Sequence, residues 1–174
     1  LMGVQYIFVV ETNSKCKSDW IYIRDTIERF YQWNQPQIKL SVVYMNGKGN
    51  YKNKEKDIRS LSKQYQSAGK GNQSKVILCF DCDEYEKDMY DQQFLNDVRQ
   101  YCRSMNYEFV WFCKDIESVY LGRSVEDKQK KKESAIFKAQ NGIKHVDVNK
   151  LLVKNYRMNS SNLMCVLDKC FARK

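Results

Sequence analysis

Acidic side chains that follow a short apolar run define the chemistry that this chain could perform. Residues 76–80 are all apolar, and Asp81, Asp83 and Glu84 come just after them. Such a run is too short for a helix of its own and fits a strand that is buried on both faces. Carboxylates beside a core destabilise the fold unless a cation or hydrogen-bond donors compensate them. We therefore expect a site at the end of this strand, with a hard divalent cation held by oxygen ligands as its partner.

A glutamate stands in the equivalent place after the first predicted strand. Residues 4–10 are rich in β-branched and aromatic side chains, which favours a strand, and Glu11 follows them. In doubly wound sheets the first and third strands commonly lie side by side, and ligands bind outside their carboxyl ends. Because neighbouring strands are about 4.8 Å apart, we expect Glu11 to come within metal-bridging reach of Asp81 and Asp83.

A further acidic pair follows the fourth predicted strand, at 107–113. Asp115 and Glu117 come just beyond it and would stand along the same edge of the sheet. Glu117 could simply be an acid on a helix surface.

Other candidate acids also have structural interpretations. Asp81 could cap the helix that follows its strand, and Asp83 and Glu84 could be first-turn acids favoured by the helix dipole. Glu11 could be a solvated strand end. These alternatives stay open in the sequence.

The elements that must position the acids alternate along the chain. The pattern predicts strands at 4–10, 38–44, 76–80 and 107–113, with amphipathic helices capped at Ser18 and Asp19, over 54–66 and around 94–105. A short helix or turn is predicted at 116–121, and further helices at 148–154 and after Ser161. Alternating helices and apolar strands indicate a three-layer α/β fold with a mainly parallel, four-stranded sheet.

The chain is long enough for one core. Its 174 residues are 43% hydrophobic, which predicts a single domain over 1–174. The core would span about 4–122, and a helical extension about 123–174. Residues 123–132 are highly charged and form either a solvated excursion or the first turns of a helix that runs to Ala139.

The charge of the chain is positive and uneven. The formal net charge is +9, which makes a polyanion such as nucleic acid a plausible partner. Residues 48–75 carry eight Lys and Arg, whereas residues 81–97 are acidic. An acidic pocket in a basic surround suits a metal that meets a phosphate backbone. The alternative is a set of solvated basic helix faces.

Cysteine usage and hydropathy bear on location. Seven cysteines, an odd number, lack disulfide-like spacing, and no signal peptide is evident, so we expect a cytoplasmic protein. Cys79 and Cys82 form one CxxC pair, but a zinc site needs further ligands and His145 is the only histidine. No apolar run approaches the roughly 20 residues that span a bilayer, so no membrane partner is expected.

A glutamate after the first strand and an Asp-x-Asp after the third, here Glu11 with Asp81 and Asp83, resemble the signature of the TOPRIM family. This is the metal-binding domain of topoisomerases, DnaG-type primases and OLD-type nucleases. The likeness extends from about Val4 to Leu121 and implies a TOPRIM-like, Rossmann-like sheet.

Among small versions of the domain, the chain is most similar to RloB-like proteins associated with phage resistance. These pair a glutamate and a downstream helix, here Glu11, Ser18 and Tyr22, with a later acid-aromatic helix, here Glu117 and Tyr120.

The resemblance implies roles for the acids. Asp81 and Asp83 would hold Mg²⁺ or Mn²⁺ directly or through waters, and Glu11 would be a ligand or general acid/base. Glu117 is the candidate for a second metal ligand, as in the two-metal OLD-type nucleases. A Lys or Arg is expected to stabilise the developing negative charge. The basic residues expected to serve that role or to contact nucleic acid are Lys15, Lys17, Lys48, Lys52, Lys114 and Arg123.

The function that the resemblance implies is a Mg²⁺-dependent nuclease that cuts DNA or RNA phosphodiesters in a phage-defence or mobile-element setting. The alternative is a weakly active or inactive TOPRIM-like module that binds nucleic acid or a partner ATPase, since OLD-type TOPRIM domains are fused to ATPases.

Overall fold

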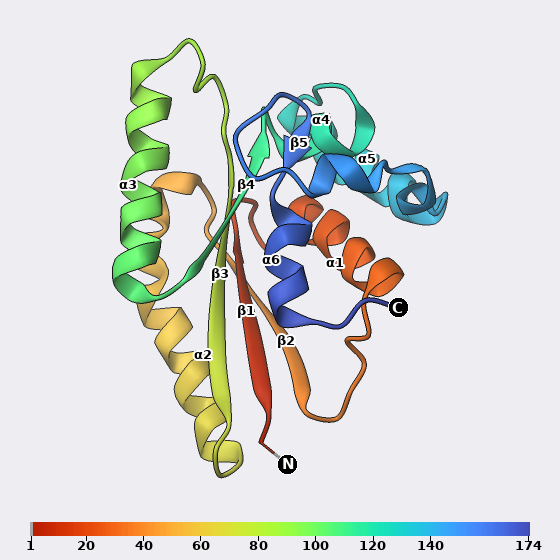
Figure 1. Ribbon diagram of the computed structural model, residues 1–174. Coiled ribbons are helices and arrows are strands. Elements are labelled where there is room, and N and C mark those ends of the chain that lie inside the picture. The colour runs from red at the N-terminus through yellow and green to blue at the C-terminus, as the bar shows by residue number, and fades with distance from the viewer. Residues whose placement is uncertain (1) are drawn as a thin grey trace.

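The computed structural model describes residues 2–174 and shows an α/β fold in three layers (Figure 1). The strands are β1 (Val4–Val10), β2 (Ile38–Tyr44), β3 (Gln73–Asp81), β4 (Glu108–Cys113) and β5 (Ser160–Ser161). The helices are α1 (Ser18–Phe30), α2 (Glu55–Ala68), α3 (Met89–Met105), α4 (Ile116–Leu121), α5 (Asp127–Ala139) and α6 (Leu163–Cys170). Helices α2 and α3 cover one face of the sheet, α1, α4 and α6 cover the other, and α5 packs against α1.

The sheet is parallel except at one edge. Its strand order is β2-β1-β3-β4-β5, and only β5 runs antiparallel to its neighbour. Strand β1 therefore lies between β2 and β3, which confirms the expectation that the first and third strands are adjacent. The carboxyl ends of β1 and β3 meet at the same edge, where Glu11 and Asp81 stand.

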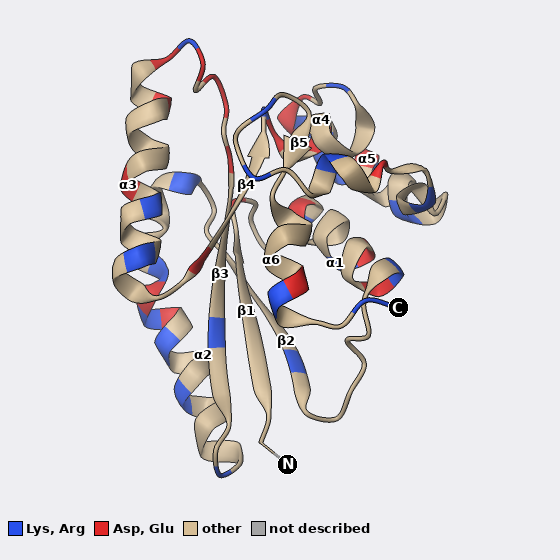
Figure 2. Cartoon of the chain, in the orientation of Figure 1, with Lys and Arg blue, Asp and Glu red and all other residues tan. Residues whose placement is uncertain are grey.

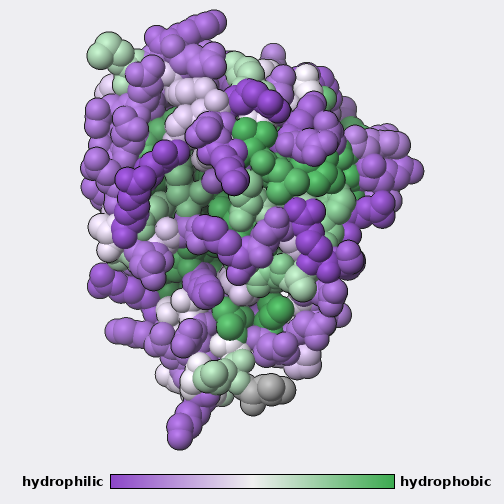
Figure 3. Space-filling model, viewed as in Figure 1, coloured by the Kyte–Doolittle hydropathy of each residue, from purple (hydrophilic) through white to green (hydrophobic). Residues whose placement is uncertain are grey.

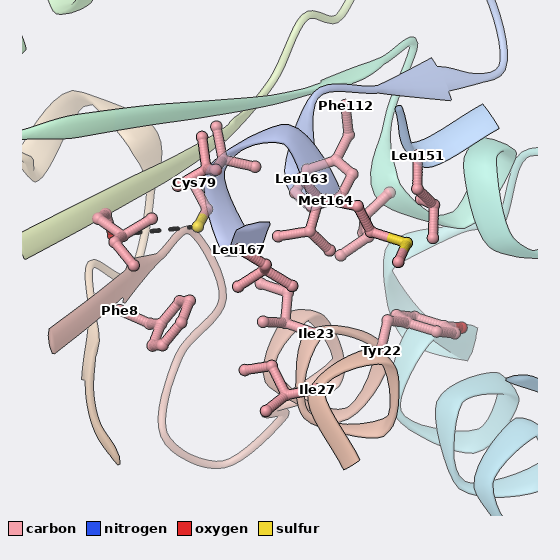
Figure 4. Close-up of a cluster of buried hydrophobic side chains, with 14 of the residues drawn as sticks. Phe8, Tyr22, Ile23, Ile27, Cys79, Phe112, Leu151, Leu163, Met164 and Leu167 are labelled. Atoms are coloured by element: carbon pink, nitrogen blue, oxygen red, sulfur yellow. Dashed lines mark hydrogen bonds between the residues drawn. The ribbon is translucent and has the colours of Figure 1, made fainter. Parts of the chain in front are cut away.

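Alternating side chains along each strand supply two separate cores. On β1, Phe8 and Val10 face α1 and α6, whereas Ile7 and Val9 face α2 and α3. Figure 4 shows the first core, in which Phe8 and Phe112 meet residues of α1 and α6 such as Ile27. A strand that is buried on both faces must be apolar at nearly every position, which is why the central strands were recognisable as apolar runs.

The C-terminal region departs most from the sequence prediction. The predicted four-stranded sheet has five strands, because Ser160 and Ser161 pair with β4. A two-residue strand carries no hydrophobic periodicity that could reveal it. The helix predicted at 148–154 is a 3₁₀ turn, η4 (Val148–Leu151), and Asp147 caps it. The charged segment after Arg123 leads into a helix, α5, rather than remaining an excursion.

None of the helices in residues 2–174 combines the length and the apolar character that a membrane-spanning helix needs.

Candidate active site at the carboxyl edge of the sheet

A pocket of about 360 Å³ lies where β1 and β3 end. Its charged lining residues are the acids Glu11, Asp19, Asp81 and Asp127 and the cations Lys48 and Lys130. Figure 2 shows further acidic residues along the segment that runs from the end of β3 to the start of α3. The pocket therefore gathers side chains from segments that are far apart in the sequence, and its acids outnumber its cations.

Glu11 points toward the end of β3. Its Oε1 atom accepts a hydrogen bond from the backbone N–H of Asp81, with an N···O distance of 3.3 Å. The parallel pairing of Val9 with Leu78 brings the two strand ends together. Glu11 is therefore not a freely solvated strand end, and it shares a pocket with Asp81 as the sequence predicted.

Asp81 is buried, with 7% of its surface exposed. Its Oδ1 atom accepts a hydrogen bond of 2.9 Å from the backbone N–H of Ile116, the first residue of α4. Asp81 thus holds the start of α4. The interpretation as a cap of the following helix is wrong, because Asp88 caps α3. Asp83 and Glu84 precede that cap, so they are not first-turn acids either.

Asp19 is a member of the pocket that sequence reasoning missed. The sequence predicts Ser18 and Asp19 as the cap and first turn of α1. Asp19 does lie in the first turn, but the cap position is Lys17 and no side chain caps the helix. The Asp19 carboxylate instead accepts a hydrogen bond of 3.2 Å from the backbone N–H of Thr12, next to Glu11. The sequence signal that could have identified Asp19 as a pocket residue is its position at the start of the helix that follows the first strand.

Glu117 is fully buried, with 0% of its surface exposed. Neither of its carboxylate oxygens has a hydrogen-bond partner. The nearest cation is the Nζ atom of Lys130, 3.7 Å from Oε2. The alternative of a helix-surface acid is therefore wrong. A buried, unpartnered carboxylate is costly, so its retention needs an explanation beyond packing.

The pKa values of these acids are raised, mainly because burial disfavours the charged form. The pKa of Glu11 rises to about 8 through burial and the nearby Asp19 and Asp83 carboxylates. Burial and Glu11 hold the pKa of Asp81 well above its ordinary value. Burial raises the pKa of Asp19 to about 6 and that of Glu117 to about 7, although Lys130 opposes both shifts. A bound cation would reverse these shifts by favouring the charged forms.

Asp83 does not line the pocket, although it lies near Glu11. It adopts a left-handed backbone conformation, with φ of 50°, and its carboxylate forms an ion pair with Lys48. Lys48 lines the pocket and also lies 3.5 Å from Asp91. The Asp-x-Asp motif is thus divided in the structure, with Asp81 in the pocket and Asp83 bound to a cation at its rim.

Most of the predicted basic residues lie away from the pocket. Lys48 is the one that lines it among the six basic candidates. Lys15 and Lys17 are exposed in the loop before α1, and Lys52 lies 5.8 Å from the ring of Tyr51. Two are held elsewhere by carboxylates: Lys114 pairs with Glu84 and Arg123 with Glu133.

Lys130 is the second residue that sequence reasoning missed. It belongs to the charged segment 123–132, for which the sequence predicts a solvated excursion or the first turns of a helix, and it lines the pocket and faces Glu117. Phe137 is buried on the face of α5 that also carries Lys130, and this burial turns the Lys130 side chain toward the pocket. The signal that separates Lys130 from Lys131 and Lys132 is its helical spacing from Phe137, which places both residues on one face of α5.

The donor set suits a hard divalent cation, since carboxylate oxygens are its preferred ligands. The unpartnered oxygens of Glu117 and the raised pKa values of Glu11 and Asp81 fit such an ion. Within residues 2–174, however, no three His, Cys, Asp or Glu side chains stand close enough to hold one ion as they are. The pocket therefore has suitable ligand atoms, but these atoms are not arranged to coordinate an ion.

The CxxC pair does not form a site. Cys79 belongs to the core under α1, whereas Cys82 faces Cys113 on β4, with the two Sγ atoms 2.7 Å apart. All three are buried.

No family model matches this chain, and neither does a curated protein or a solved structure.

Proposed function

We propose that the chain is a TOPRIM-like, Mg²⁺-dependent nuclease that hydrolyses nucleic acid phosphodiesters at the pocket lined by Glu11, Asp19 and Asp81, with Glu117 buried beside the pocket residue Lys130. The observation that carries the proposal is the crowding of buried acids at one sheet edge with too few cations to balance them. Perturbed carboxylates in a pocket are typical of catalytic and metal-binding sites.

The donor set assigns a role to each acid. Asp81 and Glu117 would hold the ion, with Glu11 beside Asp81. Bound there, Mg²⁺ would neutralise a phosphoryl oxygen and position a water molecule. Glu11, with a pKa of about 8, is suited to exchange a proton near neutral pH.

The two pocket cations have complementary roles. Lys130 lies among the acids and stabilises their ionised forms. Lys48 lies at the rim, paired with Asp83, where it can meet a phosphate oxygen of an incoming strand. The basic surroundings supply attraction for a polyanion that does not depend on its sequence.

The proposal predicts that Asp81→Asn abolishes Mg²⁺-dependent cleavage of single- or double-stranded DNA or RNA. Asparagine keeps the shape of the protonated carboxyl and its acceptor oxygen, so the fold should survive. Asp97→Asn, an exposed acid on α3, is the matched control and should keep full activity. Cleavage that persists at the wild-type rate in Asp81→Asn, and in the double variant with Asp83→Asn, would refute the nuclease proposal.

A binding module without catalysis is the second candidate, favoured by one observation. Asp83 is engaged with Lys48, and no preformed group of three ligands is present in residues 2–174. Calorimetry separates the two candidates. A saturable Mg²⁺ or Mn²⁺ signal that Asp81→Asn removes supports the nuclease, and no signal at millimolar metal supports a module that binds nucleic acid or a partner ATPase.

A further inference from the structure

A second pocket lies along the edge of β4, away from the acids. Strand β4 pairs with β3 on one side, but on its other side β5 pairs only with Phe112 and Cys113, so the first half of β4 has an open edge there. The side-chain amide of Asn162 fills part of this edge. It donates to the carbonyl oxygen of Phe109 and accepts from the N–H of Trp111, both at 2.9 Å. Because the Asn162 side chain, and not a further strand, occupies this edge of β4, a cleft of about 360 Å³ remains between α3 and α6.

The charge of this cleft is opposite to that of the acidic pocket. Four cations line it, Arg99, Arg103, Lys154 and Lys169, against a single carboxylate, Glu108. Figure 2 shows basic residues on both α3 and α6, the helices that flank β4.

The one carboxylate is already engaged. Lys169 lies 3.1 Å from Glu108. Arg99, Arg103 and Lys154 make no salt bridge within the described part of the chain. Three cations are thus free to meet an anion, and the two arginines are one helical turn apart on the same face of α3.

Aromatic rings lie among the cations. The guanidinium of Arg99 is 5.7 Å from the ring centre of Phe109 and 5.0 Å from that of Tyr156. Tyr156 in turn packs edge-on against Trp111. Figure 3 shows hydrophobic residues reaching the surface in the middle of this face, with hydrophilic side chains around them. Arg99 is therefore held in place before any ligand arrives, which lowers the entropy lost on binding.

We propose that the cleft between α3 and α6 binds the phosphate groups of a nucleotide, either free or as a unit of single-stranded nucleic acid. Charge selects an anion, and guanidinium groups match phosphate oxygens better than ammonium groups do. The half-buried ring of Phe109 offers a base a surface on which to stack. The volume lies in the range of about 300–1,000 Å³ typical of small-ligand sites. None of the cleft residues belongs to the acidic pocket, so the proposal holds whether or not that pocket hydrolyses anything.

The test is fluorescence anisotropy with a labelled single-stranded oligonucleotide of about twelve nucleotides, in buffer with EDTA so that no cleavage occurs. The variant combines Arg103→Gln with Lys154→Gln, both exposed positions. We expect affinity to fall at least tenfold. We also expect the slope of log K against log salt to become shallower by about 1.4, because each lost phosphate contact on a single strand contributes about 0.7.

The matched control is Lys56→Gln with Lys63→Gln, two exposed lysines on α2 that remove the same charge. It should keep affinity within about twofold of wild type. An equal loss in both double variants would overturn the proposal, since it would show general electrostatic attraction. If the cleft variant does not fold, the single exposed change Lys154→Glu provides the same comparison against Lys63→Glu.

Competition identifies the source of the phosphate. Displacement of the oligonucleotide by ATP assigns the cleft to a free nucleotide, and displacement only by unlabelled oligonucleotide assigns it to a strand. Displacement by poly-glutamate at equal charge concentration would overturn the proposal in favour of an acidic peptide. Failure of the oligonucleotide and of ATP to bind at all would overturn it as well.

Discussion

Among the acids at this edge of the sheet, Glu117 shows most clearly that hydrogen-bond donors are missing. It is fully buried, its oxygens have no hydrogen-bond partner, and one lysine lies 3.7 Å away. A buried charge that lacks a well-placed partner is among the more destabilising features of a fold. The chain therefore keeps an acid there at the expense of stability, as functional sites often do.

This cost should depend on pH. Burial raises the pKa of Glu117 from 4.5 to about 7 in the folded protein. The unfolded chain releases the proton at lower pH, so the stability contributed by the protonated carboxyl is full below about pH 4.5 and is lost as pH rises through 7. Glu117→Gln should raise the free energy of unfolding by about 2 to 3 kcal/mol at pH 8 without metal, and should change it little at pH 4.

Urea denaturation at several pH values measures this effect. Glu126→Gln is the control, because 73% of that side chain is exposed and its charge is solvated in both states. If wild type and Glu117→Gln lost stability in parallel between pH 4 and pH 8, Glu117 would not be the buried acid that the structure shows.

At the scale of elements, α5 decides the character of the pocket because it carries Lys130. The helix is anchored by Phe137, which is 6% exposed and packs against Tyr22 and Tyr120 at ring-centre distances of 4.9 and 5.8 Å. Gly142 approaches the same ring so closely that a Cβ atom there would lie 2.4 Å from it. The position of Lys130 thus depends on an aromatic cluster formed by Tyr22, Tyr120 and Phe137.

Phe137→Ala should therefore weaken both the fold and the site. Loss of a buried phenylalanine costs about 3 to 5 kcal/mol, and the freed helix should lower Mg²⁺-dependent cleavage through displacement of Lys130. Ile136→Ala, the adjacent residue with 37% of its surface exposed, should cost less than about 1 kcal/mol and leave cleavage unchanged. Chemical denaturation with cleavage assays checks both. Similar losses for the two variants would show that α5 is not anchored through this face.

At the scale of the molecule, the sheet sets two regions of opposite charge. The carboxyl edge of β1 and β3 gathers acids, and the open edge of β4 gathers cations. The net charge of +9 conceals this separation. The basic cleft would attract the phosphate backbone of a nucleic acid. That backbone could approach the acidic pocket only if a metal ion neutralised the carboxylates.

Metal binding should therefore stabilise the whole fold. At a free Mg²⁺ concentration of 100 times Kd, the gain is about 2.7 kcal/mol, which for a domain of this size corresponds to a rise in Tm of roughly 5 to 10 °C. Differential scanning fluorimetry should show this rise in wild type and in Asp97→Asn but not in Asp81→Asn. An equal rise in all three proteins would mean that the ion binds outside the pocket.

The sequence was sufficient for much of the fold. Strands predicted at 4–10 and 38–44 have those bounds in the structure, since local patterns of apolar residues reflect burial directly. It was also sufficient to bring Glu11 to Asp81, because a parallel sheet places strand ends at a shared edge. The sequence did not predict β5, because a strand of two residues is too short to show a hydrophobic period.

By itself, then, the sequence determined the alternation of helices and strands, the adjacency of the first and third strands and the acids at their ends. Only the tertiary structure decided that Asp19 and Lys130 belong to the pocket, that Asp83 is paired with Lys48 and that Glu117 is buried without a hydrogen-bond partner. The reason is physical. Periodicity reports which face of an element is buried, whereas the charges that meet in a pocket depend on how separate elements pack, and that information is not local in the chain.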